Sequence, residues 1–252
     1  LAIVICVYAW IHHELPLTNL FGGMIVMDRF ALFFDVAFLV AALLTVLLSG
    51  AYLKEHRFAF GEFHSLVLLV TTGMMVLIHA GDFVTLLIGL ETMSLGVYAL
   101  VACWSGNKKS AEGALKYFIM GAVASAFLIY GIALIYGATG KTNLKELALA
   151  AGSVEGSRLY MVGMFMVLGA MAFKVAMVPF HGWTPDAYEG APTPVTGFMA
   201  AAVKAAGFGV LLRVFTVTFG ADHFVYGYTG WADVRKWLAI FTMILGNLAA
   251  LR

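Results

Sequence analysis

Four ionisable residues lie inside long apolar runs of this 252-residue chain: Glu91, Lys116, Lys174 and Lys204. A charge at the centre of a membrane-spanning helix costs roughly 2.5–3.5 kcal/mol on insertion scales, so such residues face protein or water and are commonly functional. Burial lowers the pKa of a lysine from about 10.4 toward the physiological range, where it can bind and release a proton. These residue types in these positions predict a proton pathway.

Glu91 and Lys204 are expected to lie deepest. Glu91 comes nine residues after Asp82, which is about 13–14 Å along a helix, and the small residue Gly89 beside it would let another helix approach closely. Lys204 lies about 15 Å into the run that begins at Pro194, too far from either end to extend to the headgroups. For both residues the alternative is a permanent ion pair with a structural role.

Lys174 and His181 flank a proline that should interrupt a helix. Pro179 follows Lys174 by five residues and frees the backbone carbonyl of Val175. A helix broken at membrane depth is tolerated where it lines a polar cavity, as at the ion sites of transporters. His181, with an ordinary pKa of about 6.5, suits a shuttle between two lysines. Alternatively, the span ends at Pro179 with Lys174 near the interface, and His181 is structural.

Lys116 and several other polar residues lie nearer to the ends of the runs. Lys116 is about 9 Å inside its run and could extend to the headgroups, so a role in proton transfer and a position at the interface both stay open. His79 and Asp82 flank a tight turn, where solvated polar residues are ordinary. An interfacial ion pair is expected among Asp28, Arg29 and Asp35. For these residues the sequence favours a structural role.

The elements that position these residues are predicted to be transmembrane helices. Hydrophobic residues make up 62% of the chain and charged residues 12%, whereas soluble domains carry about 25% charged residues. Runs of about 20 residues satisfy their own backbone in lipid as helices. Six complete spans are expected: Phe30–Leu53, Phe63–Ala80, Phe83–Trp104, Ala111–Tyr136, Leu159–Val178 and Val195–Phe219. The predicted fold is an all-α polytopic membrane protein with partial helices at its ends, a short interfacial helix at 144–151, and one helix broken near Pro179.

Composition also excludes several classes of function. The net charge is +1 without a basic patch, which argues against a nucleic-acid partner. Cys6 and Cys103 lie in separate runs without partners at metal-ligand spacing, so we expect no iron–sulfur, haem or zinc site, no cofactor and no redox centre in this chain. The chain begins at Leu1 and stops within an apolar run, and we expect it to be a piece of a longer protein.

One segment carries a resemblance to a known family. Residues 173–196, FKVAMVPFHGWTPDAYEGAPTPVT, resemble the signature of the antiporter-like membrane subunits of proton-pumping NADH–quinone oxidoreductase, respiratory complex I. Mrp cation/proton antiporters and membrane-bound hydrogenases contain similar sequences. Residues 82–100 and 112–118 look most like subunit N, and the resemblance covers residues 63–252 well.

The resemblance implies an organisation and a role for each candidate residue. Residues 1–61 would be flanking helices, 62–219 the first five-helix repeat of an inverted-repeat fold, forming a proton half-channel, and 220–252 the start of the following helices. The motif glutamate falls on Glu91, paired with Lys174 of the broken helix. Lys204 is the lysine of the next helix, His181 lies between the two lysines, and Lys116 matches an extra lysine typical of subunit N.

The function implied is proton translocation driven by quinone reduction in other subunits of a multi-subunit enzyme. The expected location is a bacterial inner membrane, and the expected partners are other membrane-arm subunits, lipids, protons and water. Two alternatives stay open. The chain could belong to an Mrp-type antiporter or a membrane-bound hydrogenase, or it could be a scaffold whose buried charges are fixed pairs.

Overall fold

The computed structural model describes residues 1–252 except 13–16, 57–59, 105, 155–156, 220–230 and 251–252. The chain forms two compact units: residues 1–121 with 183–209, and residues 122–182 with 210–252. These units differ from the three segments expected above, which the family resemblance implies and which stay a prediction. Part of the third segment, residues 220–230, lies outside the described residues.

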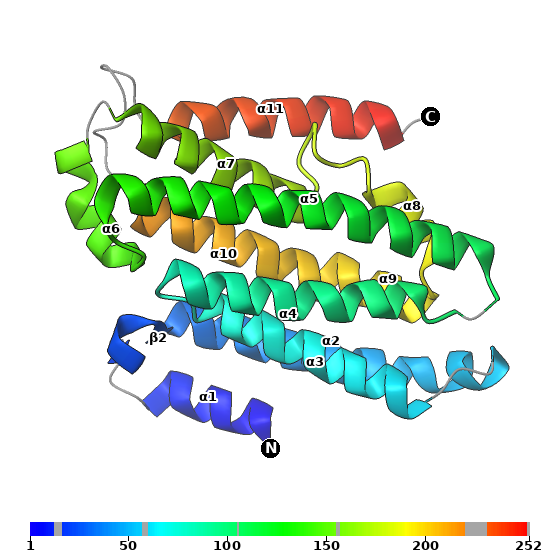
Figure 1. Cartoon of the computed structure of the whole chain (residues 1–252). Helices are drawn as coiled ribbons and strands as arrows, with labels where there is room; N and C mark the ends of the chain where they lie inside the picture. The colour runs from blue at the N-terminus through cyan, green and yellow to red at the C-terminus, as the bar shows by residue number, and fades with distance from the viewer. Residues whose placement is uncertain (13–16, 57–59, 105, 155–156, 220–230, 251–252) are drawn as a thin grey trace. The chain divides into compact units, whose positions relative to one another are not determined.

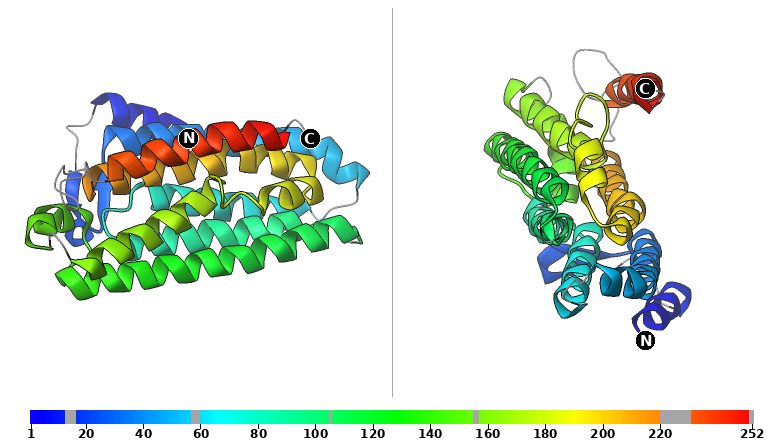
Figure 2. Two further views of the ribbon diagram at one scale, coloured as in Figure 1. Left: turned by 90° about the horizontal axis from the view of Figure 1, so that it is seen from above. Right: turned by 90° about the vertical axis from the view of Figure 1, so that its right-hand side faces the viewer.

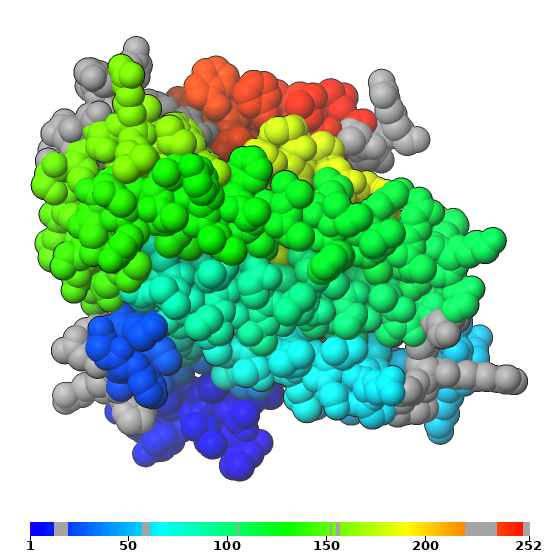
Figure 3. Space-filling model, viewed as in Figure 1, coloured from blue at the N-terminus to red at the C-terminus, as the bar shows by residue number. Residues whose placement is uncertain are grey.

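Three long helices lie side by side in the first unit (Figures 1 and 2). Their bounds are Arg29–Glu55 for α2, Phe60–Ile78 for α3 and Phe83–Ala102 for α4, and the shorter α1, Ala2–His12, packs on α2. Aspartates start two of these helices, because Asp28 accepts a hydrogen bond from the amide of Ala31 and Asp82 from that of Val84. On the face drawn in Figure 3, the atoms of α3 and α4 form a continuous surface.

A small hairpin is joined to the turn between α3 and α4. Its strands are β1, Leu17–Leu20, and β2, Ile25–Met27, with a 3₁₀ turn, Phe21–Gly23, between them. The amide of Val26 donates to the carbonyl of His79 at 2.8 Å, and the amide of Gly81 donates to that of Met24 at 2.9 Å. The hairpin therefore fixes the backbone on both sides of this turn.

The remainder of the first unit comes from later in the chain. It includes the first part of α5 (Lys108–Thr139), the short helices α8 (Thr184–Gly190) and α9 (Thr193–Phe198), a π-helical turn at Met199–Val203, and the start of α10 (Lys204–Val217). Both α9 and the π-helical turn pack on α2. Residues 193–217 form one apolar stretch that is long enough to cross a membrane.

The second unit contains the rest of α5 and α10 with four further elements. These are α6 (Leu144–Ala150), a 3₁₀ turn (Ala151–Val154), α7 (Arg158–Lys174) and α11 (Trp231–Ala250). Helices α5 and α7 cross in close contact, because a Cβ on Gly131 would lie 2.8 Å from the carbonyl oxygen of Gly163, and the reverse also holds. The short helix expected at 144–151 is confirmed as α6.

The all-α membrane fold predicted from the sequence is confirmed. Five described helical segments have the length and hydropathy of membrane spans: Arg29–Glu55, Gly61–Ile78, Phe83–Ala102, Lys108–Thr139 and Thr193–Val217. The sixth expected span corresponds to α7, which has 17 residues and ends at Lys174 rather than at Val178. It is about 25 Å long, less than the ~30 Å hydrocarbon core. The chain becomes helical again at Thr184, so the break near Pro179 is present.

Candidate functional site

The five predicted site residues are divided between the two units. Glu91, Lys116 and Lys204 belong to the first unit, and Lys174 and His181 to the second. The expected pairing of Glu91 with Lys174 therefore stays a prediction. Within each unit, the surroundings of these residues can be described directly.

Glu91 lies on α4 where α3 approaches most closely. A Cβ on Gly89 would lie 2.5 Å from the backbone nitrogen of Leu77, so the two helices touch backbone to backbone, as the small residue in the sequence predicted. The Glu91 side chain is half-buried. The hydroxyl of the neighbouring Thr92 donates to the carbonyl of Ile88 on its own helix, at 2.8 Å.

Lys204 is the first residue of α10 and follows the π-helical turn directly. Such turns occur frequently at functional sites, because they widen the helix locally. The Lys204 ammonium lies 5.4 Å from the centroid of the Tyr188 ring, within cation–π distance. Among the described residues, Lys204 forms no ion pair with a carboxylate. The alternative of a permanent ion pair at Lys204 is therefore not supported in this part of the chain.

A row of four aromatic side chains leads from α4 to Lys204. Tyr98 of α4 meets Tyr117 of α5 edge-on at 4.6 Å, Tyr117 stacks on Trp183 at 4.3 Å, and Trp183 meets Tyr188 of α8 at 6.1 Å. Tyr117 is 1% exposed. This aromatic row gives Lys204 an apolar, rigid neighbourhood on one side. The sequence shows these residues, but nothing in their spacing brings them together.

Lys116 forms ion pairs instead of lying free in the apolar phase. Its ammonium is 2.8 Å from a carboxylate oxygen of Glu112 on the same helix and 2.9 Å from one of Asp186 on α8. Lys109 forms a second ion pair with Glu189, so two lysines of α5 hold α8. The Lys116 side chain is 46% exposed, which agrees with the shallow position expected for it. Its role in proton transfer stays a prediction.

Lys174 is buried at the last position of α7, with 5% of its surface exposed. The helix ends there through a Schellman motif: the amide of Met177 donates to the carbonyl of Ala172, and the amide of Ala176 to that of Phe173. Ala176 takes the left-handed conformation, φ 58°, that glycine usually occupies in this motif. The helix therefore ends before Pro179 acts on it, which corrects the expected mechanism of the break.

His181 lies in the connection after the break and is half-buried. Its Nδ1 is buried and has no hydrogen-bond partner among the described residues. A buried polar nitrogen needs a partner, which water or a moving side chain can supply. The role of His181 in proton transfer stays a prediction.

One polar pair was missed by the sequence reasoning. His79 Nε2 lies 2.8 Å from Asp35 Oδ2, and the side chains are 13% and 3% exposed. The expectation that His79 is solvated, and that Asp35 takes part in an interfacial ion pair with Arg29, was therefore wrong. The reason is the hairpin, which covers the turn and buries both groups.

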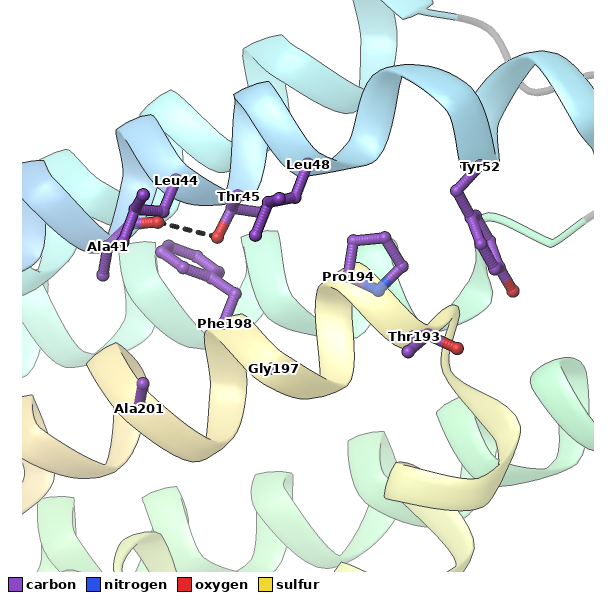
Figure 4. A pocket seen from close by; sticks show the side chains of 10 residues that line it. All are labelled: Ala41, Leu44, Thr45, Leu48, Tyr52, Thr193, Pro194, Gly197, Phe198 and Ala201. Atoms are coloured by element: carbon purple, nitrogen blue, oxygen red, sulfur yellow. Dashed lines mark hydrogen bonds between the residues drawn. The ribbon is translucent and has the colours of Figure 1, made fainter.

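The first unit also contains a groove of about 460 Å³ between α2 and α9 (Figure 4). It is lined mainly by apolar side chains, and the hydroxyl of Thr45 is turned to the carbonyl of Ala41 at 2.8 Å. The groove contributes no charged group and is not part of the predicted pathway. Among the described residues, no three side chains of His, Cys, Asp or Glu are grouped as metal ligands.

Comparison with known sequences identifies similar proteins. Residues 80–252 match the family described as NADH:quinone oxidoreductase/Mrp antiporter, TM. The chain is 48% identical over 231 residues to NADH-quinone oxidoreductase subunit N 1 of Sorangium cellulosum, covering 90% of this chain and 46% of that protein. It is 44% identical over 234 residues to subunit N of Trichlorobacter lovleyi, covering 92% and 47%. The chain thus spans about half the length of these relatives.

Chains of three solved membrane complexes have a similar fold. A chain of respiratory complex I from Thermus thermophilus with bound aureothin has a TM-score of 0.78 and 36% identity, over 99% of this chain and 50% of that chain. A chain of an archaeal respiratory membrane complex, the membrane-bound sulfane sulfur reductase, has a TM-score of 0.83 and 27% identity, over 95% and 49%. A chain of the Mrp complex from Dietzia sp. has a TM-score of 0.71 and 26% identity, over 87% and 42%.

Proposed function

Since the chain belongs to the NADH:quinone oxidoreductase/Mrp antiporter transmembrane family, we propose that it is a proton-translocating subunit of NADH–quinone oxidoreductase. It is an integral membrane protein, and its location would be a bacterial inner membrane. Its partners would be the other membrane-arm subunits of the complex. Residues 62–219 would form the first of two repeats, and residues 220–252 the start of the helices that follow it.

The proposed mechanism is a charge switch. A carboxylate close to a buried lysine stabilises its protonated form, and removing that carboxylate favours release of the proton. Glu91 would act in this way on Lys174. The released proton would pass through His181 to Lys204. Quinone reduction in other subunits would supply the energy, because none of these side chains carries out redox chemistry.

The observation that carries this proposal is the setting of Lys204. It lies in a membrane-spanning segment, directly after a π-helical turn, against the ring of Tyr188 and without a carboxylate partner among the described residues. A lysine kept only for structure would be expected to have a fixed counter-charge, because an unpaired buried charge is costly. A lysine that exchanges a proton can be neutral for part of its cycle.

Two other functions remain to be distinguished. An antiporter subunit is supported by the structural similarity to the Mrp complex, but the identity is 26%, compared with 48% for a subunit N. A scaffold without proton transfer would need fixed partners for its buried charges. Lys116 has such partners in Glu112 and Asp186, so a structural role is better supported for Lys116 than for Lys204.

The proposal can be tested with Lys204→Ala in the intact complex, reconstituted in liposomes. We expect normal assembly, together with loss of most of the protons pumped per NADH oxidised. The matched control is Lys145→Ala, because Lys145 is exposed on α6 outside the spans. Normal assembly and an unchanged pumping ratio in Lys204→Ala would refute the proposal.

A further inference from the structure

The Asp35–His79 pair lies outside the predicted pathway and has an unusual arrangement of hydrogen-bonding groups. His79 Nδ1 is 2.9 Å from the carbonyl oxygen of Val26, and Nε2 is 2.8 Å from Asp35 Oδ2. Asp35 is 2% exposed, and its second oxygen, Oδ1, has no hydrogen-bond partner among the described residues. One carboxylate oxygen is therefore held by the ring, and the other is buried and open to a further donor.

The hydrogen bonds determine how many protons the pair holds. The Val26 carbonyl can only accept, so Nδ1 must carry a hydrogen. The contact between Nε2 and Oδ2 also needs one proton, which either gives imidazolium beside carboxylate or imidazole beside carboxylic acid. In both forms the two side chains share one proton, and the pair is neutral overall. Loss of that proton would leave a buried carboxylate facing a nitrogen lone pair, so its release requires water or a cation at the open oxygen Oδ1.

Among the described residues, the ion pair of Asp35 is with His79, and α10 also carries a buried arginine, Arg213, one turn after Gly209. Of the elements that pack on α2, β2, α9 and the π-helical turn carry no ionisable side chain. Helix α1 contributes Cys6, and the pKa of its thiol is raised by burial and, to a smaller extent, by the charge of Asp35.

The other ionisable groups near the pair are at a helix end or are already bonded. In α3, Glu62 and His64 lie at the opposite end of the helix from His79. Asp82, after the turn, accepts from the amide of Val84. At the start of α2, capping of the helix occupies Asp28, and Arg29 follows it.

Helix α10, which begins with Lys204, packs on the residues next to this pair. A Cβ on Gly209 would lie 2.6 Å from Ile78 Cδ1 and 3.2 Å from the ring of Phe34. These two residues immediately precede His79 and Asp35 in the chain. Lys204 lies five residues before Gly209, which is about 7.5 Å along the helix axis. The helix that carries Lys204 therefore packs directly beside the pair.

We propose that Asp35 and His79 form a buried proton-binding site that takes up and releases one proton at the hairpin end of the first unit. The proton resides between Nε2 and Oδ2, and the open oxygen Oδ1 is where water or a cation arrives to displace it. A place for this site after Lys204 in the proton pathway rests on the proposed function. The binding of a proton by the pair does not depend on that function.

Infrared titration of the intact complex tests proton binding directly. In the wild type, the carboxyl and imidazole bands of the pair should change together in one step as the pH is varied. Asp35→Asn keeps the hydrogen bond, because the amide can donate to Nε2, but it should remove this shared step. Asp28→Asn is the matched control, since asparagine caps a helix as well as aspartate does. If Asp35→Asn and Asp28→Asn give the same titration as the wild type, the site does not exist.

Proton pumping tests the place of the pair in the pathway. A pair that only fixes the hairpin would tolerate Asp35→Asn, because the hydrogen bond to His79 is retained. We expect instead that Asp35→Asn lowers the protons pumped per NADH several-fold, and that Asp28→Asn does not. Loss of pumping in Lys204→Ala with normal pumping in Asp35→Asn would overturn this role alone. Normal pumping in Lys204→Ala would overturn the proposed function and leave the infrared result to decide on proton binding.

Discussion

Replacement of Gly89 by alanine should separate α3 from α4 and displace Glu91. The added methyl group would lie 2.5 Å from the backbone nitrogen of Leu77 and 2.7 Å from its Cα, about 1 Å closer than carbon contacts normally allow. Backbone atoms cannot rotate away, so the cost falls at the upper end of the ~1–3 kcal/mol typical of overpacking. Alanine recovers about 1 kcal/mol of helix propensity, which leaves a net destabilisation of about 2 kcal/mol.

Thermal unfolding of the full-length protein, followed with a dye that reacts with newly exposed thiols, measures this effect. The half-buried Cys6 and Cys103 report on the first unit. We expect the midpoint to fall by roughly 4–8 °C for Gly89→Ala. Gly50→Ala is the matched control, since a Cβ on Gly50 in α2 meets no atom within 4 Å. Equal midpoints for the two variants would refute the close approach of α3 and α4.

Three further predictions concern Ala176, the ion pair between Lys116 and Asp186, and the Cys103 thiol. Ala176→Gly should stabilise the protein by about 1 kcal/mol or less in the same thermal assay, because glycine takes the left-handed conformation of the Schellman motif without strain. A double-mutant cycle of Lys116→Gln and Asp186→Asn should give a coupling below about 1 kcal/mol, because both side chains are 46% exposed; a larger value would contradict this solvated geometry. Burial raises the pKa of the Cys103 thiol to about 11. In a Cys6→Ser background, maleimide labelling of Cys103 should therefore be slow at neutral pH and become faster as the pH approaches 11. Fast labelling at neutral pH would contradict this.

The sequence predicts those parts of the site that depend on one helix. The depth of Glu91 follows from counting residues after Asp82, and Gly89 indicates the close approach of a second helix. That helix is α3 in the structure. The shallow position of Lys116 also follows from its distance to the end of the apolar run. These properties are local, so spacing along the chain is enough to infer them.

Contacts between distant segments could not be predicted in this way. His79 and Asp35 are 44 residues apart, and it is the β-hairpin that encloses them, with no clear signal in the sequence. Lys116 and Asp186 are 70 residues apart. The position of Asp35, about 9 Å past the start of its helix, was a usable signal, because Lys116 was singled out at a similar depth. The end of α7 was misplaced because alanine replaces the usual glycine of its terminating motif.

Lys204→Arg in the intact complex tests most directly whether Lys204 exchanges a proton. Arginine keeps a positive charge and can also lie over the Tyr188 ring, but it does not release its proton in proteins. If Lys204 transfers protons, Lys204→Arg should assemble normally and lose most of the protons pumped per NADH, as Lys204→Ala does. Pumping at the wild-type ratio in Lys204→Arg would show that a fixed charge is sufficient and would contradict the proposed pathway.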